Sequence, residues 1–369
     1  MSEQFNNKDY GDYFSAIEKS FNKESKQPKQ ENSISSITKS NKKKLRFRPW
    51  VYVTALSLVV LIVIISISGG KGAKNPSDDI KPSPLVESEQ PTENIVENQP
   101  ESLFADFSEQ TLKIDADIES ENIIVINCDA NKVVAARNAN AKCYPASTTK
   151  IMTILTAVEH ITDYNKTFEF SYEITDPLYV QNATVAGFKD EESVNMTDML
   201  YGAILPSGAD ATVGLALSIA GGEEEFVKLM NKKAQDLGLK NTHFTNSSGL
   251  FNEDHYTTAE DMAVIIRAAM ENDLCKKILS TYQYTTNKTL QNPEGIELTS
   301  TLFSHMYGTE PEGATILGGK TGFVSESGYC IASFGKSDSG TEYVCVTLKG
   351  VSLWPTIYDQ IDLYSRYAK

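Results

Sequence analysis

Hydrophobic and polar positions divide this chain into parts of different character. From 50 to 68 it reads WVYVTALSLVVLIVIISIS, a run of 19 residues without an ionisable side chain. At about 1.5 Å of rise per residue, a helix of this length crosses the roughly 30 Å hydrocarbon core of a bilayer. Five basic residues lie just before it, at 42–44, 46 and 48. Because such residues stay in the cytoplasm, we predict a single-pass cell-membrane helix at 49–68 with a cytoplasmic N-terminus.

The segments on either side of this run have no apolar periodicity. Residues 1–48 are rich in Asn, Lys, Ser and Gln, which predicts a disordered cytoplasmic tail. Residues 69–104 combine five prolines with acidic residues, as is typical of an extended linker. Residues 105–369 are then expected to form one extracytoplasmic domain. A buried core helix and a cleaved signal peptide are the alternatives for 49–68, and its length and position favour the membrane span over both.

Within 105–369 the pattern changes from strands to helices and back to strands. β-rich runs at 122–128 and 132–136 predict one hairpin, and runs at 328–334 and 342–348 predict another. The apolar spacing between them is helical, over 151–158, 199–205, 213–219, 226–234 and 262–270. A capping box of Thr257 and Glu260 precedes the last of these helices, and a further helix is expected at 355–369. The order predicts an α+β fold in which one antiparallel sheet is flanked by helices and joined to an all-helical lobe.

Charge and histidine spacing exclude several functions. The chain has 34 Lys and Arg against 49 Asp and Glu, a net charge of −15, so no nucleic-acid partner is expected. This charge is segregated, because residues 1–48 hold 11 basic and 6 acidic side chains whereas residues 105–369 hold 20 and 36. The four histidines, at 160, 243, 255 and 305, lack metal-ligand spacing, and a structural role is expected for His255. Neither a metal nor an organic cofactor is implied.

All five cysteines, at 128, 143, 275, 330 and 345, lie in the predicted outer domain. Their odd number and the absence of zinc-type spacing make a disulfide framework improbable. Cys330 and Cys345 could face each other across the second hairpin and form a bond. Free buried thiols are the more frequent outcome, and we expect them here.

The first candidate for chemistry is Ser147-Thr-Thr-Lys150, which leads directly into the apolar helix at 151–158. A serine needs a base to become a nucleophile, and a lysine three positions later on a helix lies within reach of it. Positive potential at the helix start favours a neutral amine. Ser-x-x-Lys occurs six times in the chain, but only Ser147 begins a buried helix. We therefore single out this pair.

Two further segments carry candidate polar groups. Leu205-Pro-Ser207-Gly-Ala209-Asp210 is a turn between two apolar helices, and it could present Ser207 to a cleft. Gly318-Gly-Lys320-Thr321-Gly322-Phe323 precedes the closing strands, and its glycines permit close approach, as on an edge strand that lines a cleft. Each segment alone would be read as an ordinary turn.

Together, and in this order, the three segments resemble the Ser-x-x-Lys, Ser-x-Asn and Lys-Thr-Gly signature of penicillin-binding proteins and serine β-lactamases. The phrases PASTTKIMT, LPSGADAT, NSSGLFNEDHYTTAEDMA and GGKTGF, with the opening hairpin, resemble the low-molecular-mass D-alanyl-D-alanine carboxypeptidases (peptidase family S11) more specifically. The similarity extends over nearly all of 105–369. It implies the serine β-lactamase/DD-peptidase-like fold, removal of the terminal D-alanine from a peptidoglycan pentapeptide, and covalent inhibition by β-lactams.

The resemblance also implies a role for each matched residue. Ser147 would be the nucleophile, Lys150 its base, and Ser207 a proton relay to the leaving amine. Backbone N–H groups of Ser147 and Phe323 would form the oxyanion hole. The terminal carboxylate of the substrate would bind the Lys-Thr-Gly strand, whose matched residues are Lys320, Thr321 and Gly322.

Ala209 departs from the family pattern, which has asparagine at this position. The missing amide would lose a hydrogen bond worth about 1–3 kcal/mol, which lowers the rate or alters specificity. A low-activity or non-catalytic wall-binding sensor is therefore the main alternative. A β-lactamase and a glutaminase of the same fold are further alternatives, although no Glu-x-x-Leu-Asn-like stretch supports a β-lactamase.

Overall fold

A computed structural model describes residues 102–306 and 308–369. The predicted cytoplasmic tail, the span at 49–68 and nearly all of the linker lie outside these residues. Within the described ranges, no helix is both long and apolar enough to cross a bilayer. Leu103, close to the predicted start of the domain, already contacts the fold, since its carbonyl accepts a hydrogen bond from Arg267.

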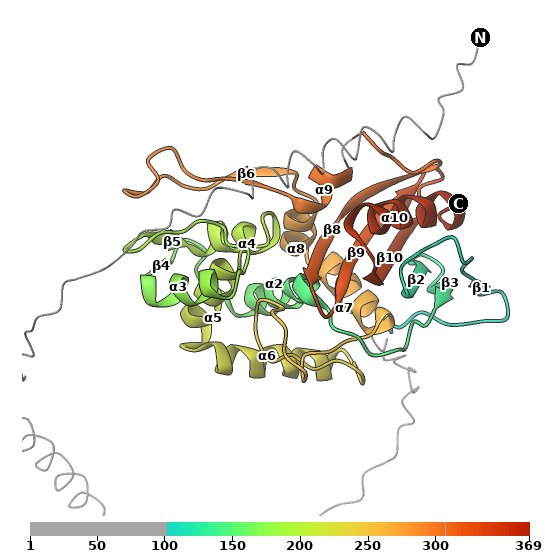
Figure 1. The fold of residues 1–369 in the computed structure, drawn as a ribbon, viewed down its shortest axis with the longest axis horizontal. Coiled ribbons are helices and arrows are strands. Elements are labelled where there is room, and N and C mark those ends of the chain that lie inside the picture. Colours follow the sequence, from blue (N-terminus) through green and yellow to red (C-terminus); the bar gives the residue numbers. More distant parts are fainter. Residues whose placement is uncertain (1–101, 307) are drawn as a thin grey trace, which may run out of the picture. The chain divides into compact units, whose positions relative to one another are not determined.

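One sheet joins the two ends of the domain, as predicted (Figure 1), but it is mixed and not wholly antiparallel as expected. In the described part of the chain its order is β1-β3-β2-β10-β9-β8. All neighbours are antiparallel except the short β1, which runs parallel to β3. The strands are β1 (Leu112–Lys113), β2 (Asn122–Asn127), β3 (Lys132–Arg137), β8 (Ala314–Val324), β9 (Gly328–Ser337) and β10 (Glu342–Gly350). β8 therefore occupies an edge of this sheet.

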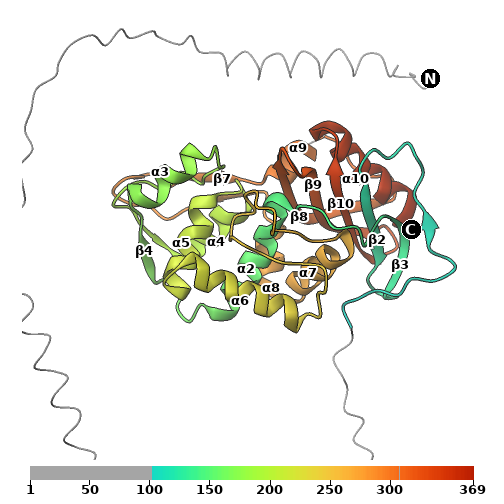
Figure 2. The same ribbon diagram turned by 60° about the horizontal axis from the view of Figure 1, so that its bottom comes forward.

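Most of the described helices lie between the two groups of strands along the chain, the last helix follows the final strand, and a helical lobe stands beside the sheet (Figures 1 and 2). The helices are α2 (Thr149–His160), α3 (Tyr172–Val180), α4 (Met196–Ile204), α5 (Ala209–Ala220), α6 (Glu223–Asp236), α7 (Ala259–Glu271), α8 (Asp273–Leu279), α9 (Thr301–Met306) and α10 (Leu353–Tyr367). Two small antiparallel pairs complete the fold, β4 (Thr167–Glu169) with β5 (Ser193–Asn195) and β6 (Gln283–Thr285) with β7 (Glu297–Thr299). The predicted α+β arrangement is confirmed.

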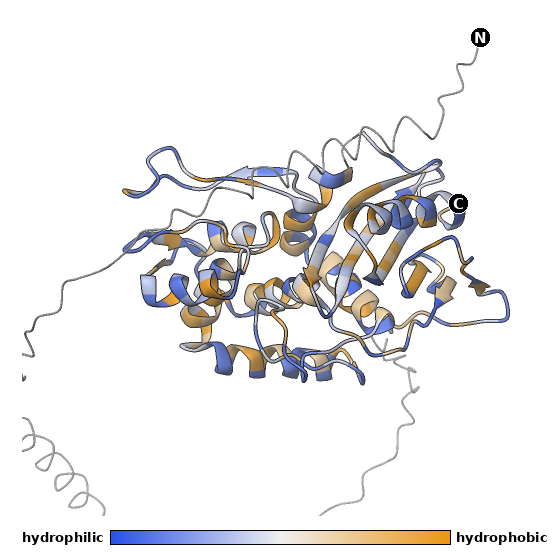
Figure 3. Cartoon of the chain, viewed as in Figure 1, coloured by the Kyte–Doolittle hydropathy of each residue, from blue (hydrophilic) through white to orange (hydrophobic). Residues whose placement is uncertain are grey.

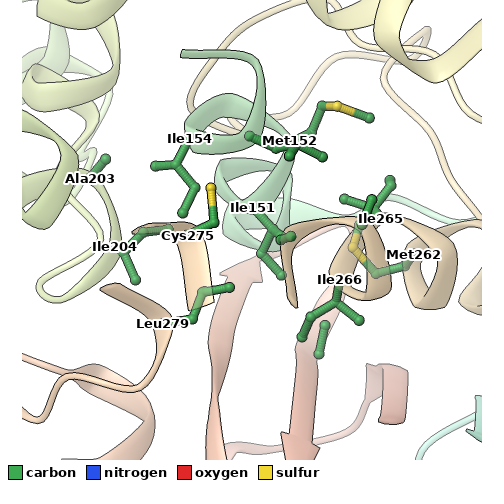
Figure 4. Packing of buried hydrophobic residues seen from close by; sticks show 14 of the residues in the cluster. Ile151, Met152, Ile154, Ala203, Ile204, Met262, Ile265, Ile266, Cys275 and Leu279 are labelled. Atoms are coloured by element: carbon green, nitrogen blue, oxygen red, sulfur yellow. The ribbon is translucent and has the colours of Figure 1, made fainter. Parts of the chain in front are cut away.

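The sheet has a core on each face because alternate side chains of a strand point to opposite sides. In β2, Ile124 and Ile126 join the core shared with α2 and α7, whereas Ile123 and Val125 join the core under α10. Apolar stripes of the helices face inward (Figure 3). Figure 4 shows α2 at the centre of the larger core, where its isoleucines meet side chains of α4, α7 and α8. This packing fixes the helix that follows Ser147.

The predicted cap of α7 is wrong by one residue. Thr258, not Thr257, accepts the capping hydrogen bond, from the backbone N–H of Asp261 at 3.0 Å. Thr257 is held in a bridge with Cys143, and its carbonyl accepts the Cys143 N–H at 2.9 Å. The helix therefore begins only after this tertiary contact, at Ala259.

The cysteines are free thiols, as expected, and the possible Cys330–Cys345 bond is excluded by register. Cys345 of β10 pairs with Ser333 of β9, an odd number of positions from Cys330. The two thiols consequently lie on opposite faces of the sheet, in different cores. Burial raises the pKa of Cys330 to about 11 and that of Cys143 to about 12, so these thiols stay protonated at neutral pH.

Candidate active site

Ser147 lies in a single 3-10 turn, Ala146–Thr148, directly before α2. The preceding Ala146 has φ +48°, a left-handed conformation that is unusual for alanine and is often found at functional sites. The apolar residues that follow anchor α2 in the core. The Ser147 side chain is thus presented from a rigid element at the point where the helix begins.

Lys150 is buried beside Ser147, with 2% of its surface exposed. Its Nζ donates to Ser147 Oγ at 2.9 Å and to the Ser248 carbonyl at 2.6 Å. Burial lowers the pKa of Lys150 to about 7, and the negative charge of Asp210 opposes this shift. Near neutral pH a large fraction of this amine is therefore unprotonated and able to accept the serine proton.

The loop that contacts Lys150 comes from the segment after α6 and is held by polar side chains. The Asn246 carboxamide oxygen accepts from the backbone N–H of Gly249 at 2.7 Å, and Glu223 accepts from both the N–H and the hydroxyl of Ser247. Gly249 has φ +81°. A Cβ on it would lie 1.9 Å from the Ala146 carbonyl oxygen, so glycine is required for this close approach.

No role for this loop was predicted from the sequence, where the phrase that contains Ser248 and Gly249 is part of the family resemblance only. The Ser-Gly pair was the available signal, since such pairs mark tight turns. The side to which the Ser248 carbonyl points could not be read from the sequence.

Ser207 lies in the turn between α4 and α5, is 7% exposed, and has φ +70°. The neighbouring Asp210 ties the start of α5, just after this turn, to the segment 186–188. Its carboxylate accepts backbone N–H groups of Ala186 at 2.7 Å, Gly187 at 3.0 Å, Phe188 at 3.3 Å and Ala211 at 2.8 Å. Burial raises the pKa of Asp210, and these N–H groups oppose the rise. Asp210 was not among the site residues predicted from the sequence.

The Lys-Thr-Gly segment lies on β8 against the Ser147 turn. A Cβ on Gly322 would lie 2.7 Å from the Ser147 backbone nitrogen, so the strand and the turn approach closely. Lys320 is 1% exposed and donates to the Thr321 carbonyl at 2.8 Å. Burial and, to a lesser extent, the nearby Lys150 hold its pKa well below the usual lysine range. The Thr321 hydroxyl is 2.7 Å from that of Thr301, on α9.

A cavity of about 480 Å³ opens over Ser147. Among the predicted site residues, Ser147, Lys150 and Phe323 line it, as does Ala209. Ser207, Lys320, Thr321 and Gly322 do not, although each lies within three residues of a lining residue in the chain. The other lining residues are Gln181–Thr184, Ser248–Phe251 and Val324–Glu326.

His255 is buried near this site without facing the cavity. Its Nδ1 accepts the Thr245 backbone N–H at 3.1 Å, and its Nε2 lies 2.8 Å from the hydroxyl of Thr149. Burial lowers the pKa of His255 to about 3, so the ring is neutral. It joins the 245–250 loop to the start of α2, which fits the expected structural role. Among the described residues, no group of three or more His, Cys, Asp or Glu side chains is arranged to hold a metal ion.

The fold is that of the penicillin-binding DD-peptidases. The crystal structure of the Streptomyces K15 DD-transpeptidase is 26% identical, with a TM-score of 0.60, and the match covers 68% of this chain and 97% of that one. The D-alanyl-D-alanine carboxypeptidase from Mycobacterium tuberculosis gives 26% identity and a TM-score of 0.58, over 66% of this chain and 90% of that one.

Comparisons of sequence agree with those of structure and also identify the family. The profile of the D-alanyl-D-alanine carboxypeptidase family matches residues 108–351, and the chain belongs to this family. The D-alanyl-D-alanine carboxypeptidase DacF of Bacillus subtilis is 33% identical over 218 residues, 59% of this chain. DacA of Haemophilus influenzae is 31% identical over 246 residues, 63% of this chain. The matches span 54% and 57% of the lengths of these two relatives.

Proposed function

We propose that this protein is a serine-type D-Ala-D-Ala carboxypeptidase that removes the terminal D-alanine from peptidoglycan stem peptides. The observation that carries the proposal is the buried Lys150 amine, 2.9 Å from the Ser147 hydroxyl, with its pKa lowered to about 7. A neutral amine in contact with a hydroxyl at a helix start can activate that hydroxyl as a nucleophile. Family membership supports the same reaction.

In the proposed reaction, Ser147 Oγ attacks the carbonyl carbon between the two D-alanines, and Lys150 takes the hydroxyl proton. The backbone N–H groups of Ser147 and Phe323 stabilise the oxyanion. Ser207 relays a proton to the leaving nitrogen, so the C–N bond breaks, D-alanine departs with a neutral amino group and its carboxylate, and an ester to Ser147 remains. Lys320 and Thr321 bind the terminal carboxylate, with Gly322 giving the strand its close approach. Water then hydrolyses the ester.

The deciding experiment measures D-alanine release from a pentapeptide by the full-length chain, together with covalent labelling by a fluorescent penicillin. We expect both, with the label on Ser147. Labelling without D-alanine release would favour a non-catalytic wall-binding sensor. Rapid penicillin turnover would favour a β-lactamase, and glutamine hydrolysis in place of D-alanine release would favour a glutaminase.

The acylation rate should depend on pH through Lys150. The base must be neutral, and its pKa is lowered to about 7, so acylation is expected to rise with pH up to about 7 and to level off above it. The rate should fall about tenfold for each pH unit well below 7. Stopped-flow acylation by a β-lactam whose charge is constant over pH 5–9 measures this profile. A flat profile would contradict the assignment of Lys150 as the base.

Restoring the family asparagine should increase activity. Ala209 lines the cavity, and its backbone N–H is held by the Thr184 carbonyl at 2.7 Å. Ala209→Asn places an amide where substrate and Lys150 can reach it, and we expect kcat/KM for D-alanine release to rise about tenfold. Ala209→Leu is the control, because leucine is similar in size to asparagine but has no hydrogen-bonding groups. Its kcat/KM for D-alanine release should not rise. Equal rates in all three proteins would show that the amide is not the limiting feature.

We further propose that residues 49–68 anchor the protein in the cell membrane, with residues 105–369 outside. The uncharged run and the basic cluster before it support this orientation. In intact protoplasts, added protease should digest an epitope at the C-terminus and spare one at the N-terminus. Recovery of a shortened protein from the medium would indicate cleavage near residue 68 instead.

A further inference from the structure

The exposed carboxylate of Glu326 projects from the turn that follows the Lys-Thr-Gly strand. This turn, between β8 and β9, is fixed by Ser327, whose hydroxyl donates to the Gly328 carbonyl at 2.6 Å and accepts the Val324 N–H at 3.1 Å. Glu326 itself is exposed and lines the cavity over Ser147. A rigid turn therefore holds a flexible acidic side chain at the mouth of the site.

The exposed surface of this cavity carries charge of one sign only. Among the described residues that line it, Lys150 and Glu326 are the ionisable ones, and Lys150 is buried with a lowered pKa. In the described part of the chain, no side chain forms an ion pair with Glu326. The exposed wall of the cavity thus carries an unpaired negative charge.

The neighbouring cavity, of about 420 Å³, also borders Glu326 and contains two lysines that are already engaged. The Lys142 ammonium lies 4.1 Å from the centre of the Tyr256 ring, a cation–π contact. Lys349 forms an ion pair with Glu121. Among the described residues neither lysine forms an ion pair with Glu326, which leaves its carboxylate available to a ligand.

The position of Glu326 relative to a bound peptide follows from strand geometry. β8 is an edge strand, to which an extended peptide can be added. A substrate with its terminal carboxylate at Lys320–Thr321 and its scissile carbonyl at Phe323 runs antiparallel to β8. Each residue of the peptide advances about 3.3 Å, so the residue before the two D-alanines passes the end of β8 at Val324, where the turn that carries Glu326 begins.

We infer that Glu326 selects stem peptides whose residue before the two D-alanines carries a free side-chain amine. The carboxylate would pair with that ammonium at the mouth of the cavity. An acylated amine, as in a crosslinked peptide, has no positive charge and would lose this contact. The inference rests on the proposed carboxypeptidase function and adds to it a preference for uncrosslinked substrate.

The test compares D-alanine release by the full-length chain from two pentapeptides, one with lysine as the third residue and one with Nε-acetyl-lysine. An exposed ion pair supports a preference of about fivefold in kcat/KM for the free amine, expressed mainly in KM, because the contact does not change during the reaction. In Glu326→Gln this ratio should fall to about one. The preference of the unmodified protein should also shrink as salt is raised.

Glu253→Gln is the matched control, since Glu253 borders the neighbouring cavity but not the one over Ser147. It should keep the fivefold ratio. An equal rate on both peptides in the unmodified protein, or a ratio that persists in Glu326→Gln, would overturn the inference while leaving carboxypeptidase activity intact. If neither peptide releases D-alanine, the proposed function fails and the inference fails with it.

Discussion

Replacing Ser147 with alanine is expected to abolish covalent labelling by penicillin and to reduce D-alanine release by about a thousandfold or more. In the proposed reaction this hydroxyl forms the ester, and it lies 2.9 Å from the Lys150 amine that would take its proton. Gel fluorescence after labelling and a coupled D-alanine assay measure the two effects. Mass spectrometry of the labelled unmodified protein should locate the adduct on Ser147.

The matched control for Ser147→Ala is Ser304→Ala. Ser304 is an exposed serine of α9 that donates to the Thr301 carbonyl, outside the residues that line the cavity. The Ser304→Ala protein should be labelled by penicillin at the rate of the unmodified protein. Lys150 keeps its bond to the Ser248 carbonyl when the Ser147 hydroxyl is removed, so Ser147→Ala should remain folded. Undiminished labelling of a folded Ser147→Ala protein would contradict the assignment of the nucleophile.

Patterns that depend on local sequence predicted the fold well. β2 is a run of β-branched residues, β10 combines valine and threonine with Tyr, Cys and Leu, and α2 shows apolar residues at helical spacing, so their positions followed from the apolar pattern. The terminal hairpins were also expected to share one sheet, which they do through the pairing of β2 with β10. The Ser147–Lys150 contact is local as well, because three positions on a helix bring the two side chains together.

Features that depend on tertiary contacts could not be predicted. The second partner of Lys150, the Ser248 carbonyl, lies 98 positions away in a loop whose direction is set by Asn246 and Glu223. The cap of α7 moved by one residue because Thr257 bridges to Cys143. Register separated Cys330 from Cys345 in the same way. In each case a contact between residues far apart in the sequence decided the outcome, and the local sequence does not specify such a contact.

The second large effect is expected for Gly249→Ala, because the 245–250 loop contacts the turn that carries Ser147. Gly249 has φ +81°, and an added Cβ would lie 1.9 Å from the Ala146 carbonyl oxygen and 3.0 Å from the Ser147 backbone nitrogen. Both neighbours are backbone atoms of the turn that carries Ser147, so the loop or the turn must move. Either movement would lengthen the hydrogen bonds that join the Lys150 amine to the Ser248 carbonyl and to the Ser147 hydroxyl. Penicillin acylation should fall about a hundredfold, and the free energy of unfolding by about 3 kcal/mol or more.

Gly221→Ala is the control that separates the steric clash of the added Cβ from the cost of placing alanine in a left-handed conformation. Gly221 has a similar φ of +75°, but a Cβ there would meet nothing within 4 Å. This variant carries only the cost of a left-handed alanine, about 1 kcal/mol, and should be acylated normally. The difference between the two variants, measured by thermal unfolding and by the acylation rate, isolates the contact between the 245–250 loop and the Ser147 turn. Equal losses in both would show that this loop does not hold the nucleophile in place.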